Sequence, residues 1–401
     1  MLIPLGLVLV LLAGAAEAAP SVDVYTFGPG DDLFSRFGHS AICVAGGSDR
    51  DGSVADPSEA DQGGAGEGEA DGRCYNFGTA DFSTPVPLTL RFLRGEAEFW
   101  VSEVPRGAML DFYRRSDRSI WRQRLSLDTA QAEAIRRSLE ATVNSDARFY
   151  RYHHYLDNCT TRIRDLLDPV TGGRLSDGAR LASGPTLRDL TRAGFVSQPS
   201  LLMLSELVLG RAVDRQTSRW ERMFLPAELM QAIADRLAAP PVLEYERRGP
   251  LAGGSTRGGA LALAALGLLG GLGLWALTRY APRADRWARA AAGLSLGLAA
   301  LVPWALALFS TVPELRQNEA LLVLLPTDLF LGFLGDRAAR RYLRFRFLGL
   351  GAVAALRITG VLLQPLAALI ALVAVPLAVL WIGARSGHGK GVAIDPRQPL
   401  A

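Results

Sequence analysis

The sequence predicts an α+β domain followed by an α-helical transmembrane bundle of about five spans. Three observations support this organisation. The 401-residue chain is 49% hydrophobic and only 21% charged, which is too apolar for one ordinary globular domain. Its formal net charge of +3 is unevenly divided, because residues 258–401 carry 14 basic and 6 acidic side chains. Strand and amphipathic helix patterns fill residues 20–250, whereas apolar runs of spanning length begin near residue 258.

The first residues have the pattern of an export signal. Residues 2–13 form an apolar run that is short for a span, and the small-residue pattern Ala16-Glu17-Ala18 follows it. We therefore expect residues 1–19 to be a signal peptide that directs residues 20–250 out of the cytoplasm. An uncleaved anchor is the alternative, since no Lys or Arg precedes the run.

Two strand signals in the soluble half flank a polar insertion. Strands are expected near 39–45 and 74–78, and residues 46–73 contain 8 acidic residues, 2 Arg and no apolar side chain larger than Val. Such a segment cannot bury enough apolar surface to fold, so we expect a disordered surface loop. Amphipathic helices are predicted over Thr129–Val143, Cys159–Leu167, 200–210 and 226–238.

The three cysteines are an odd count for an exported chain. Cys43 ends and Cys74 begins the two strands that flank the insertion, so a disulfide between them would hold the hairpin together. Three unpaired thiols are the alternative. If the pair forms, Cys159 is the free thiol. It lies at the predicted start of a helix, where free N–H groups and the helix dipole stabilise a thiolate.

A nucleophilic cysteine needs a base, and the strand register suggests His39. If Cys43 faces Cys74 in an antiparallel pair, His39 faces Gly78 and Asn76 is its diagonal neighbour on the same face. Asn76 could then orient the imidazole, as in Cys-His-Asn sites. The other histidines are interpreted as loop, strand-end or tail residues: His153, His154 and His388.

Three segments between residues 28 and 168 resemble the periplasmic domain of the Lnb-type bacterial lipoprotein N-acyltransferases: GPGDDLFSRFGHSAI, YNFGTADF and YHHYLDNCTTRIRDLLD. Residues 318–328, NEALLVLLPTD, resemble a membrane motif of that family, with Asn318 and Pro326 at matching places. The order of His, polar residue and Cys is similar to that of circularly permuted papain-like proteins, including NlpC/P60 relatives. The resemblance therefore implies a circularly permuted papain-like (NlpC/P60-like) thiol domain.

The resemblance also implies an enzyme, a thiol acyltransferase with Cys159 as nucleophile and His39 as general base. An acyl chain would pass from a phospholipid to Cys159 as a thioester. The free amine of a diacylglyceryl-cysteine at a lipoprotein N-terminus would then accept it. We expect four further residues to bind substrate: Asn158, Arg162, Asn318 and Glu319. The alternative for Arg162 is a solvated charge on the face of the helix.

Residues 258–385 are expected to form the membrane domain. The predicted spans are Gly259–Thr278, about 290–310, about 320–335, and two short spans within 347–384 that bend near Gln364-Pro365. Four spans are the alternative.

The distribution of arginines predicts the orientation of these spans. Basic loops at 279–289 and 336–346 would be cytoplasmic, with the tail 386–401, which leaves residues 20–250 outside the cytoplasm. The resemblance implies that this side is the periplasm and that the membrane is a bacterial inner membrane. Arg357 and Asp328 within the spans are costly in lipid and are therefore functional candidates. The alternative is that each side chain snorkels to the interface or faces a neighbouring helix.

Several classes of function are disfavoured. The adjacent histidines and Cys159 lack a usual metal-ligand spacing, and no phosphate-binding glycine loop is present, so neither metal nor cofactor is expected. Basic residues flank apolar runs, which argues against nucleic acid as a partner. The partners that the resemblance implies are a phospholipid acyl donor, bacterial lipoproteins as acceptors, and membrane lipid. A cell-wall papain-like cysteine peptidase or amidase remains an alternative. A non-catalytic membrane adaptor is another, and it predicts that Cys159→Ser is silent.

Overall fold

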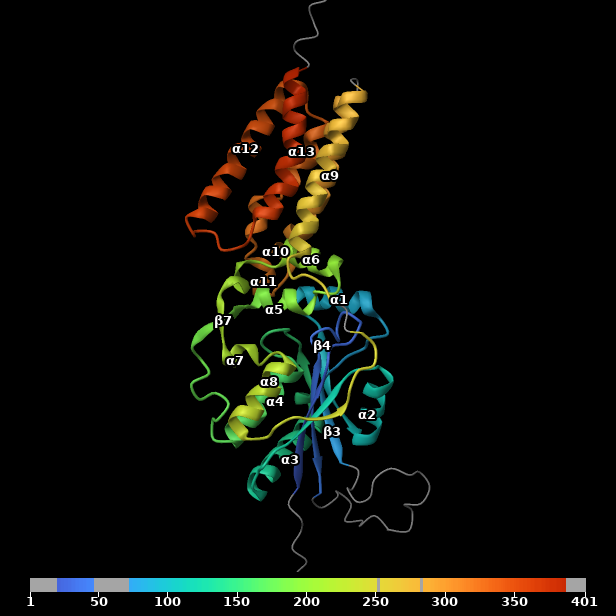
Figure 1. Ribbon diagram of the computed structural model, residues 1–401, viewed down its shortest axis with the longest axis vertical. Coiled ribbons are helices and arrows are strands. Elements are labelled where there is room, and N and C mark those ends of the chain that lie inside the picture. The colour runs from blue at the N-terminus through green and yellow to red at the C-terminus, as the bar shows by residue number, and fades with distance from the viewer. Residues whose placement is uncertain (1–19, 47–71, 251–252, 282–283, 387–401) are drawn as a thin grey trace, which may run out of the picture.

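The computed structural model describes residues 20–46, 72–250, 253–281 and 284–386. A mixed α+β unit and a set of long helices follow one another along the longest axis of the molecule (Figure 1). The expected signal peptide (1–19), nearly all of the acidic insertion (46–73) and the expected tail beyond residue 386 lie outside the described residues.

A seven-stranded antiparallel sheet forms the centre of the α+β unit, in the order β6-β4-β3-β2-β1-β5-β9. The strands are β1 (Ser21–Phe27), β2 (His39–Ala45), β3 (Arg73–Thr79), β4 (Glu98–Pro105), β5 (Ile120–Arg124), β6 (Phe149–Arg151) and β9 (Val242–Tyr245). The two expected strands therefore correspond to β2 and β3. The register pairs Cys43 with Cys74, and a disulfide joins them.

Helices cover both faces of this sheet. α2 (Arg106–Arg115) packs on one face, and α3 (Thr129–Val143), α4 (Cys159–Val170) and α8 (Pro226–Leu237) pack on the other. The other helices of this part of the chain are α1 (Pro85–Arg94), α5 (Leu187–Gly194), α6 (Pro199–Val208) and α7 (Arg219–Arg222). Short connections are η2 (Asp146–Arg148), η3 (Arg211–Asp214) and the pair β7 (Ala182–Thr186) and β8 (Gln216–Ser218).

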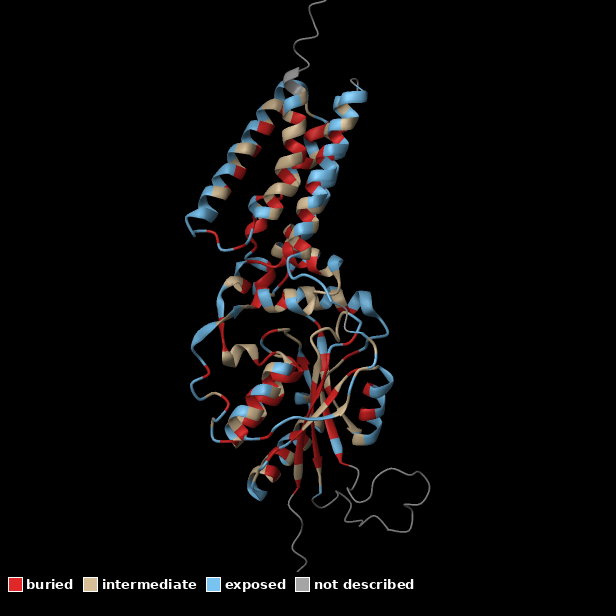
Figure 2. Cartoon of the chain, in the orientation of Figure 1, coloured by how far each residue is buried: buried red, intermediate tan, exposed pale blue. Residues whose placement is uncertain are grey.

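The central strands are apolar on both sides because each face carries a helical layer. One core combines Val24 and Ile42 of the sheet with α3, α4 and α8, for example Ile135, Ile163 and Ile233. The opposite core combines Phe27 with α2. Figure 1 shows α2 on one side of the sheet and α3, α4 and α8 on the other, and Figure 2 shows the strands between them as buried.

The C-terminal region contains four long helices: α9 (Gly258–Tyr280), α10 (Asp285–Phe309), α12 (Asp336–Ile358) and α13 (Ala367–Ser386). Glycines let α9 and α13 approach closely, since a Cβ at Gly267 would lie 2.6 Å from the Cα of Leu372. The outer faces of these helices expose large apolar side chains (Figure 2), including Leu261, Leu269, Leu348 and Ile358. Such surfaces are typical of contact with a membrane.

The expectation of five membrane-spanning helices is wrong. Among the described residues only α9 and α10 are long and apolar enough to cross a membrane. The interval 336–346, expected as a loop, begins α12 and places several arginines in that helix. The apolar part of α13, Ala367–Gly383, is shorter than a usual span.

The expected third span near 320–335 is not an α-helix. It forms two 3₁₀ segments, η4 (Glu319–Leu322) and η5 (Pro326–Gly332), that pack against α10. A Cβ at Gly293 of α10 would lie 2.5 Å from the carbonyl oxygen of Asp328, so the glycine makes room for this backbone. An apolar run specifies burial, but it does not distinguish an α-helix from an irregular segment covered by other helices.

Candidate active site

Cys159 is the first residue of α4, and Asn158 fixes that helix end. The Asn158 Oδ1 accepts the backbone N–H groups of Thr160 and Thr161, both at 2.9 Å. Its Nδ2 donates to the carbonyls of His154 (2.8 Å) and Phe224 (2.9 Å). Both polar atoms of the Asn158 side chain therefore position the helix end that carries Cys159. A contact between Asn158 and substrate stays a prediction.

Hydrogen bonds also fix the loop before Cys159. His153 and Asp157 exchange two backbone hydrogen bonds, of 2.9 and 3.0 Å. Arg162 of α4 donates to both carboxylate oxygens of Asp157, at 2.7 and 2.9 Å, and its guanidinium lies 3.8 Å from the centre of the Tyr150 ring. Arg162 thus joins the loop, the helix and β6, and its expected role in substrate binding stays a prediction.

His39 opens β2 and reaches toward both Asn76 and Cys159. Its Nε2 lies 3.3 Å from the Asn76 Oδ1. An amide oxygen only accepts, so Nε2 carries the proton in this contact and Nδ1 is left for the thiol. The ring stacks near Phe27 and Tyr113, with centroids 6.0 and 5.9 Å away, which limits its rotation.

Gly78 explains how His39 and Cys159 meet. It is the extra residue of a bulge in the pairing of β3 with β4, and its φ of +99° is one that other residues rarely adopt. A Cβ there would lie 3.5 Å from the Cys159 Cβ and 4.0 Å from the His39 Cε1. Since the bulge follows Asn76, the diagonal contact between Asn76 and His39 survives it. The absence of a side chain at residue 78 leaves the space between Cys159 and His39 open.

The environment of Cys159 favours its thiolate. Burial raises the pKa of the thiol, but the charge of His39 and its hydrogen bond, the backbone N–H of Ser40 and the Thr160 hydroxyl together lower it to about 7. The residue is 8% exposed and is the free cysteine of the described chain. A large fraction of this thiol is therefore ionised at neutral pH, as a nucleophile requires.

Tyr150 is a functional candidate that sequence reasoning missed. Among the described residues its hydroxyl has no hydrogen-bond partner, although the residue is 93% buried. The hydroxyl lies 3.8 Å from the position of a Gly78 Cβ, which is also next to Cys159. Burial raises the pKa of Tyr150, so the group stays protonated and can donate. The aromatic run before Cys159 was the only signal, and it does not reveal where a hydroxyl points.

An apolar cavity of about 260 Å³ opens beside Cys159 and His39. Its wall is built from several parts of the chain, among them the segment before β2, the loop before α4, the helices α1 and α6, and the connection after α10. Aromatic and aliphatic side chains dominate this wall, among them Phe34, Phe37, Phe92, Leu204, Val208 and Leu315. Because Cys159 is one of the lining residues, an apolar group bound here would lie next to its sulfur.

Residues 15–193 match the model of one protein family, the Lnb N-terminal periplasmic domain. The N-terminal part of this chain belongs to the Lnb-type family. The match includes His39, Asn76 and Cys159 and ends within α5. Comparisons with the curated proteins and with the solved structures find no match. The family match and the two apolar helices α9 and α10 together identify the chain as a membrane protein with a periplasmic N-terminal domain.

Asn318 and Glu319 lie where the helical region meets α6 and η3 of the α+β unit, and Glu319 pairs with Arg211 of η3 at 3.5 Å. Asn318 donates to the carbonyls of Leu207 (2.8 Å) and Val208 (3.2 Å) at the end of α6. Glu319 accepts the backbone N–H groups of residues 363 and 364, at 2.9 and 2.8 Å. Both residues are 6% exposed, and neither is among the described residues that line the cavity beside Cys159. Their expected role in substrate binding stays a prediction.

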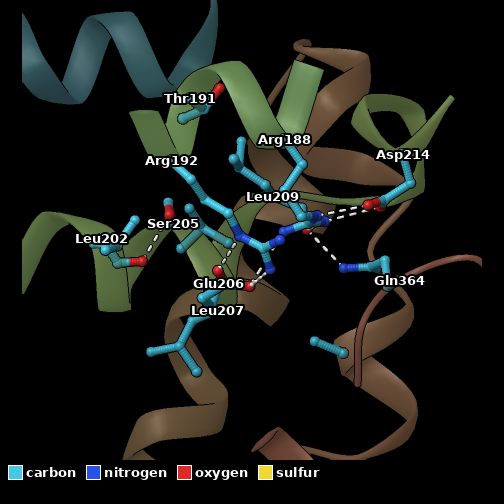
Figure 3. A network of polar contacts seen from close by, with 12 residues as sticks. Arg188, Thr191, Arg192, Leu202, Ser205, Glu206, Leu207, Leu209, Asp214 and Gln364 are labelled. Atoms are coloured by element: carbon cyan, nitrogen blue, oxygen red, sulfur yellow. Dashed lines mark hydrogen bonds and ion pairs between the residues drawn. The ribbon is translucent and has the colours of Figure 1, made fainter. Parts of the chain in front are cut away.

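We call the buried polar contacts between the α+β unit and the helical region the joint. Figure 3 shows the part of the joint that lies on α5 and α6. Arg188 donates to both carboxylate oxygens of Asp214, at 2.7 and 3.0 Å, and to the Leu209 carbonyl at 2.8 Å. The same carbonyl accepts a 2.7 Å hydrogen bond from the Gln364 side chain, and Arg192 pairs with Glu206. The two parts of the molecule therefore share one buried polar network that lies directly behind the cavity wall.

The two charged residues expected within spans also have protein partners. Asp328 pairs with Arg346 of α12 at 3.0 Å and accepts the Tyr342 hydroxyl at 2.6 Å. Arg357 donates to the Gln364 carbonyl at 2.8 Å. These contacts tie η5 and the loop after α12 to the other helices. Within the described part of the chain, no group of three or more His, Cys, Asp or Glu side chains is arranged to hold a metal ion.

Proposed function

We propose that this protein is a membrane-bound lipoprotein N-acyltransferase. It moves an acyl chain from a phospholipid, through a thioester on Cys159, to the N-terminal amine of a diacylglyceryl-cysteine lipoprotein. The observation that carries the proposal is the apolar cavity, which begins at the activated Cys159 and His39 and includes Val312 and Leu315 from the helical region. A cavity wall of this composition suits an acyl chain, whereas a peptide would leave its polar backbone unpaired there.

The arrangement of the three catalytic candidates is similar to that of papain-like enzymes. A Cys at a helix N-terminus, a His on a neighbouring strand and an Asn that accepts from the His ring form a Cys-His-Asn site. The chain order here is His39, Asn76 and Cys159, which is the order expected of a circular permutation. Membrane attachment through the helical region would keep this site next to the lipid that supplies the acyl group.

Acylation of the enzyme would release a lysophospholipid. The Cys159 thiolate attacks the ester carbonyl of the phospholipid, a C–S bond forms, and the electron pair of the carbonyl moves onto its oxygen. When that oxyanion collapses, the C–O bond to the glycerol breaks and the protonated His39 gives its proton to the departing alkoxide. The products are the Cys159 thioester and the lysophospholipid alcohol.

Transfer to the acceptor would return the enzyme to its starting state. The neutral N-terminal amine attacks the thioester carbonyl, a C–N bond forms, and His39 accepts the proton that the amine loses. The C–S bond then breaks, and the thiolate leaves beside the imidazolium. In sum, an ester and an amine become an amide and an alcohol.

Both steps pass through an oxyanion, and two donors are near the place where it forms. The backbone N–H of Cys159 belongs to the first turn of α4, where helical N–H groups lack partners within the helix. The unpartnered Tyr150 hydroxyl supplies the second. Donors directed at the developing charge are among the largest contributions to catalysis.

Intact-mass analysis tests this function. The full-length protein, purified from membranes, is incubated with phospholipid vesicles beside its Cys159→Ala variant. We expect the wild type alone to gain the mass of one acyl chain, sensitive to hydroxylamine and discharged by a diacylglyceryl-cysteine peptide with a free amine. An unmodified but alkylatable thiol would reject acyl transfer, and cleavage of cell-wall peptides by the same sample would favour the peptidase. Full biological function of Cys159→Ser would favour the adaptor.

A further inference from the structure

We propose that His153 and Glu314 form a binding site for a primary ammonium group in the wall of the apolar cavity. His153 belongs to the loop before α4, whereas Glu314 belongs to α11 (Pro313–Arg316), which follows α10. The two side chains meet at 3.3 Å, between the His153 Nε2 and the Glu314 Oε2, and both line the same cavity as Cys159. Only the identity of the molecule that carries the ammonium rests on the proposed acyl transfer.

Two atoms of this pair are buried without a hydrogen-bond partner among the described residues: the His153 Nε2 and the Glu314 Oε2. The other ring nitrogen of His153, Nδ1, accepts the backbone N–H of Leu156 at 3.3 Å. The lone pairs of the Glu314 Oε2 are therefore left for a donor that a ligand brings into the cavity.

Within the described part of the chain, no neighbouring cation donates a hydrogen bond to the Glu314 Oε2. His154 is neutral, because burial and then the charge of the neighbouring His153 lower its pKa to about 4. Arg215 acts on Glu314 from a distance, but its guanidinium is bound to Glu221 at 2.5 Å and is half exposed. The Glu314 side chain is only 9% exposed, and although burial raises its pKa, the neighbouring His153 lowers it below the usual value, so the carboxyl stays ionised. A buried carboxylate oxygen without a donor is costly, and a bound ammonium would relieve the cost.

The shape and chemistry of the cavity select the type of cation. Its other walls are mostly aromatic and aliphatic, so the ligand is an ammonium on an apolar body. The His153 loop is closed onto Asp157, two residues before Cys159, which fixes the carboxylate relative to the sulfur. Two participants in the proposed reaction have a primary ammonium: a phosphatidylethanolamine headgroup on the donor, and the N-terminal amine of the acceptor before it loses its proton.

Protection of Cys159 from alkylation tests the site without relying on acyl transfer. The full-length protein is treated with iodoacetamide in the presence of decylamine or of decan-1-ol, which share the same chain. We expect decylamine to protect Cys159 at a concentration about tenfold lower than decan-1-ol, since hydrogen bonds to charged groups are worth about 1.5–3 kcal/mol. Glu314→Gln keeps the shape of the side chain, and it should make the two compounds equal.

The matched control is Glu96→Gln. Glu96 is an exposed carboxylate two residues after Arg94, whose carbonyl accepts the Thr311 N–H. It therefore lies near the contact between the α+β unit and the segment after α10, but it does not line the cavity. Its variant should keep the tenfold preference. Equal melting temperatures and equal alkylation rates without ligand show that Glu314→Gln is folded. A wild type without preference, or a preference that persists in Glu314→Gln, would overturn the site.

Two acyl-transfer measurements identify the source of the ammonium. If the donor headgroup binds, Glu314→Gln slows thioester formation from phosphatidylethanolamine vesicles about tenfold but not from phosphatidylglycerol vesicles. If the acceptor binds, thioester formation is unchanged and discharge by the peptide amine slows. Equal slowing with both lipids, with normal discharge, counts against ammonium binding. A wild type that prefers decylamine yet forms no thioester would keep the site and reject the proposed function.

Discussion

Two buried polar clusters on opposite sides of the cavity wall differ in how completely their hydrogen bonds are satisfied. At the joint between the two parts of the molecule, Arg188, Asn318 and Gln364 use nearly every polar atom on a neighbour. At the site of Cys159, the Tyr150 hydroxyl and the Nε2 of His154 have no partner among the described residues. Satisfied groups maintain a structure, whereas unsatisfied buried groups are available to a ligand.

The largest difference between the clusters concerns chemistry. Replacing Cys159 by Ala should reduce thioester formation and acyl transfer by a factor on the order of 10⁴ or more, since the nucleophile acts as a unit with its base. Unfolding of the variant should differ little from wild type, because the thiol is not part of the joint. Intact mass and thermal unfolding measure the two effects. Acyl transfer that persists in the variant would contradict the assignment of Cys159.

A substitution in the joint should lower the stability of the protein and leave the chemistry of Cys159 unchanged. Arg188→Met leaves Asp214 buried without its partner and should lower the free energy of unfolding by about 3–5 kcal/mol. The pKa of Cys159 should stay near 7 in this variant, since Arg188 makes no contact with the site. Arg215→Met is the control, because Arg215 is half exposed and its pair with Glu221 contributes no more than about 1 kcal/mol. Equal destabilisation by both variants would remove the distinction between the clusters.

Tyr150→Phe removes one hydroxyl from the site and nothing from the joint. We expect a decrease of about 10²–10³ in the rate of thioester formation if the hydroxyl binds the oxyanion. The pKa of Cys159 should change little, because Tyr150 is not among the groups that lower it. Single-turnover acylation followed by mass gives the rate, and alkylation against pH gives the pKa. An unchanged rate would leave the hydroxyl without a catalytic role.

His39→Gln tests the electrostatics of the thiol. In the folded protein His39 stabilises the thiolate, so the pKa of Cys159 lies at about 7, below its usual value. Removal of the imidazole takes away the largest stabilisation of the thiolate and leaves burial opposed only by the Ser40 N–H and the Thr160 hydroxyl, so the pKa should rise. Alkylation at pH 7 should then fall about tenfold or more, and its midpoint should move to higher pH. A midpoint that stays near pH 7 would mean that the helix end alone activates Cys159.

The local parts of the site were predictable from the sequence. Asn158 before an amphipathic segment signals a helix start, and Cys43 and Cys74 define a register that makes Asn76 a neighbour of His39. These inferences rest on short-range geometry, which depends little on the rest of the chain. The bulge at Gly78 was not predictable, because its position depends on β4 rather than on β2 and β3.

The helical region was predicted less well for a related reason. Apolar composition identified α9 and α10, but it could not distinguish a spanning helix from the irregular segment 319–335. Arginines that suggested a loop are part of α12, where Arg346 is buried against Asp328. Hydropathy measures the transfer of side chains from water, and it does not report which backbone partners a segment finds.

By itself the sequence determined the division into an α+β unit and an apolar helical region, the strands that bring His39 to Asn76, and the helix end that carries Cys159. Only the tertiary structure decided where the side chains of Tyr150 and Glu314 point and that α11 forms part of the cavity wall. It also decided that Asn318 and Glu319 belong to the joint between the two parts of the molecule. The reason is physical. Periodicity and capping act over a few residues, whereas a cavity and its unpaired groups arise where segments more than a hundred residues apart pack together.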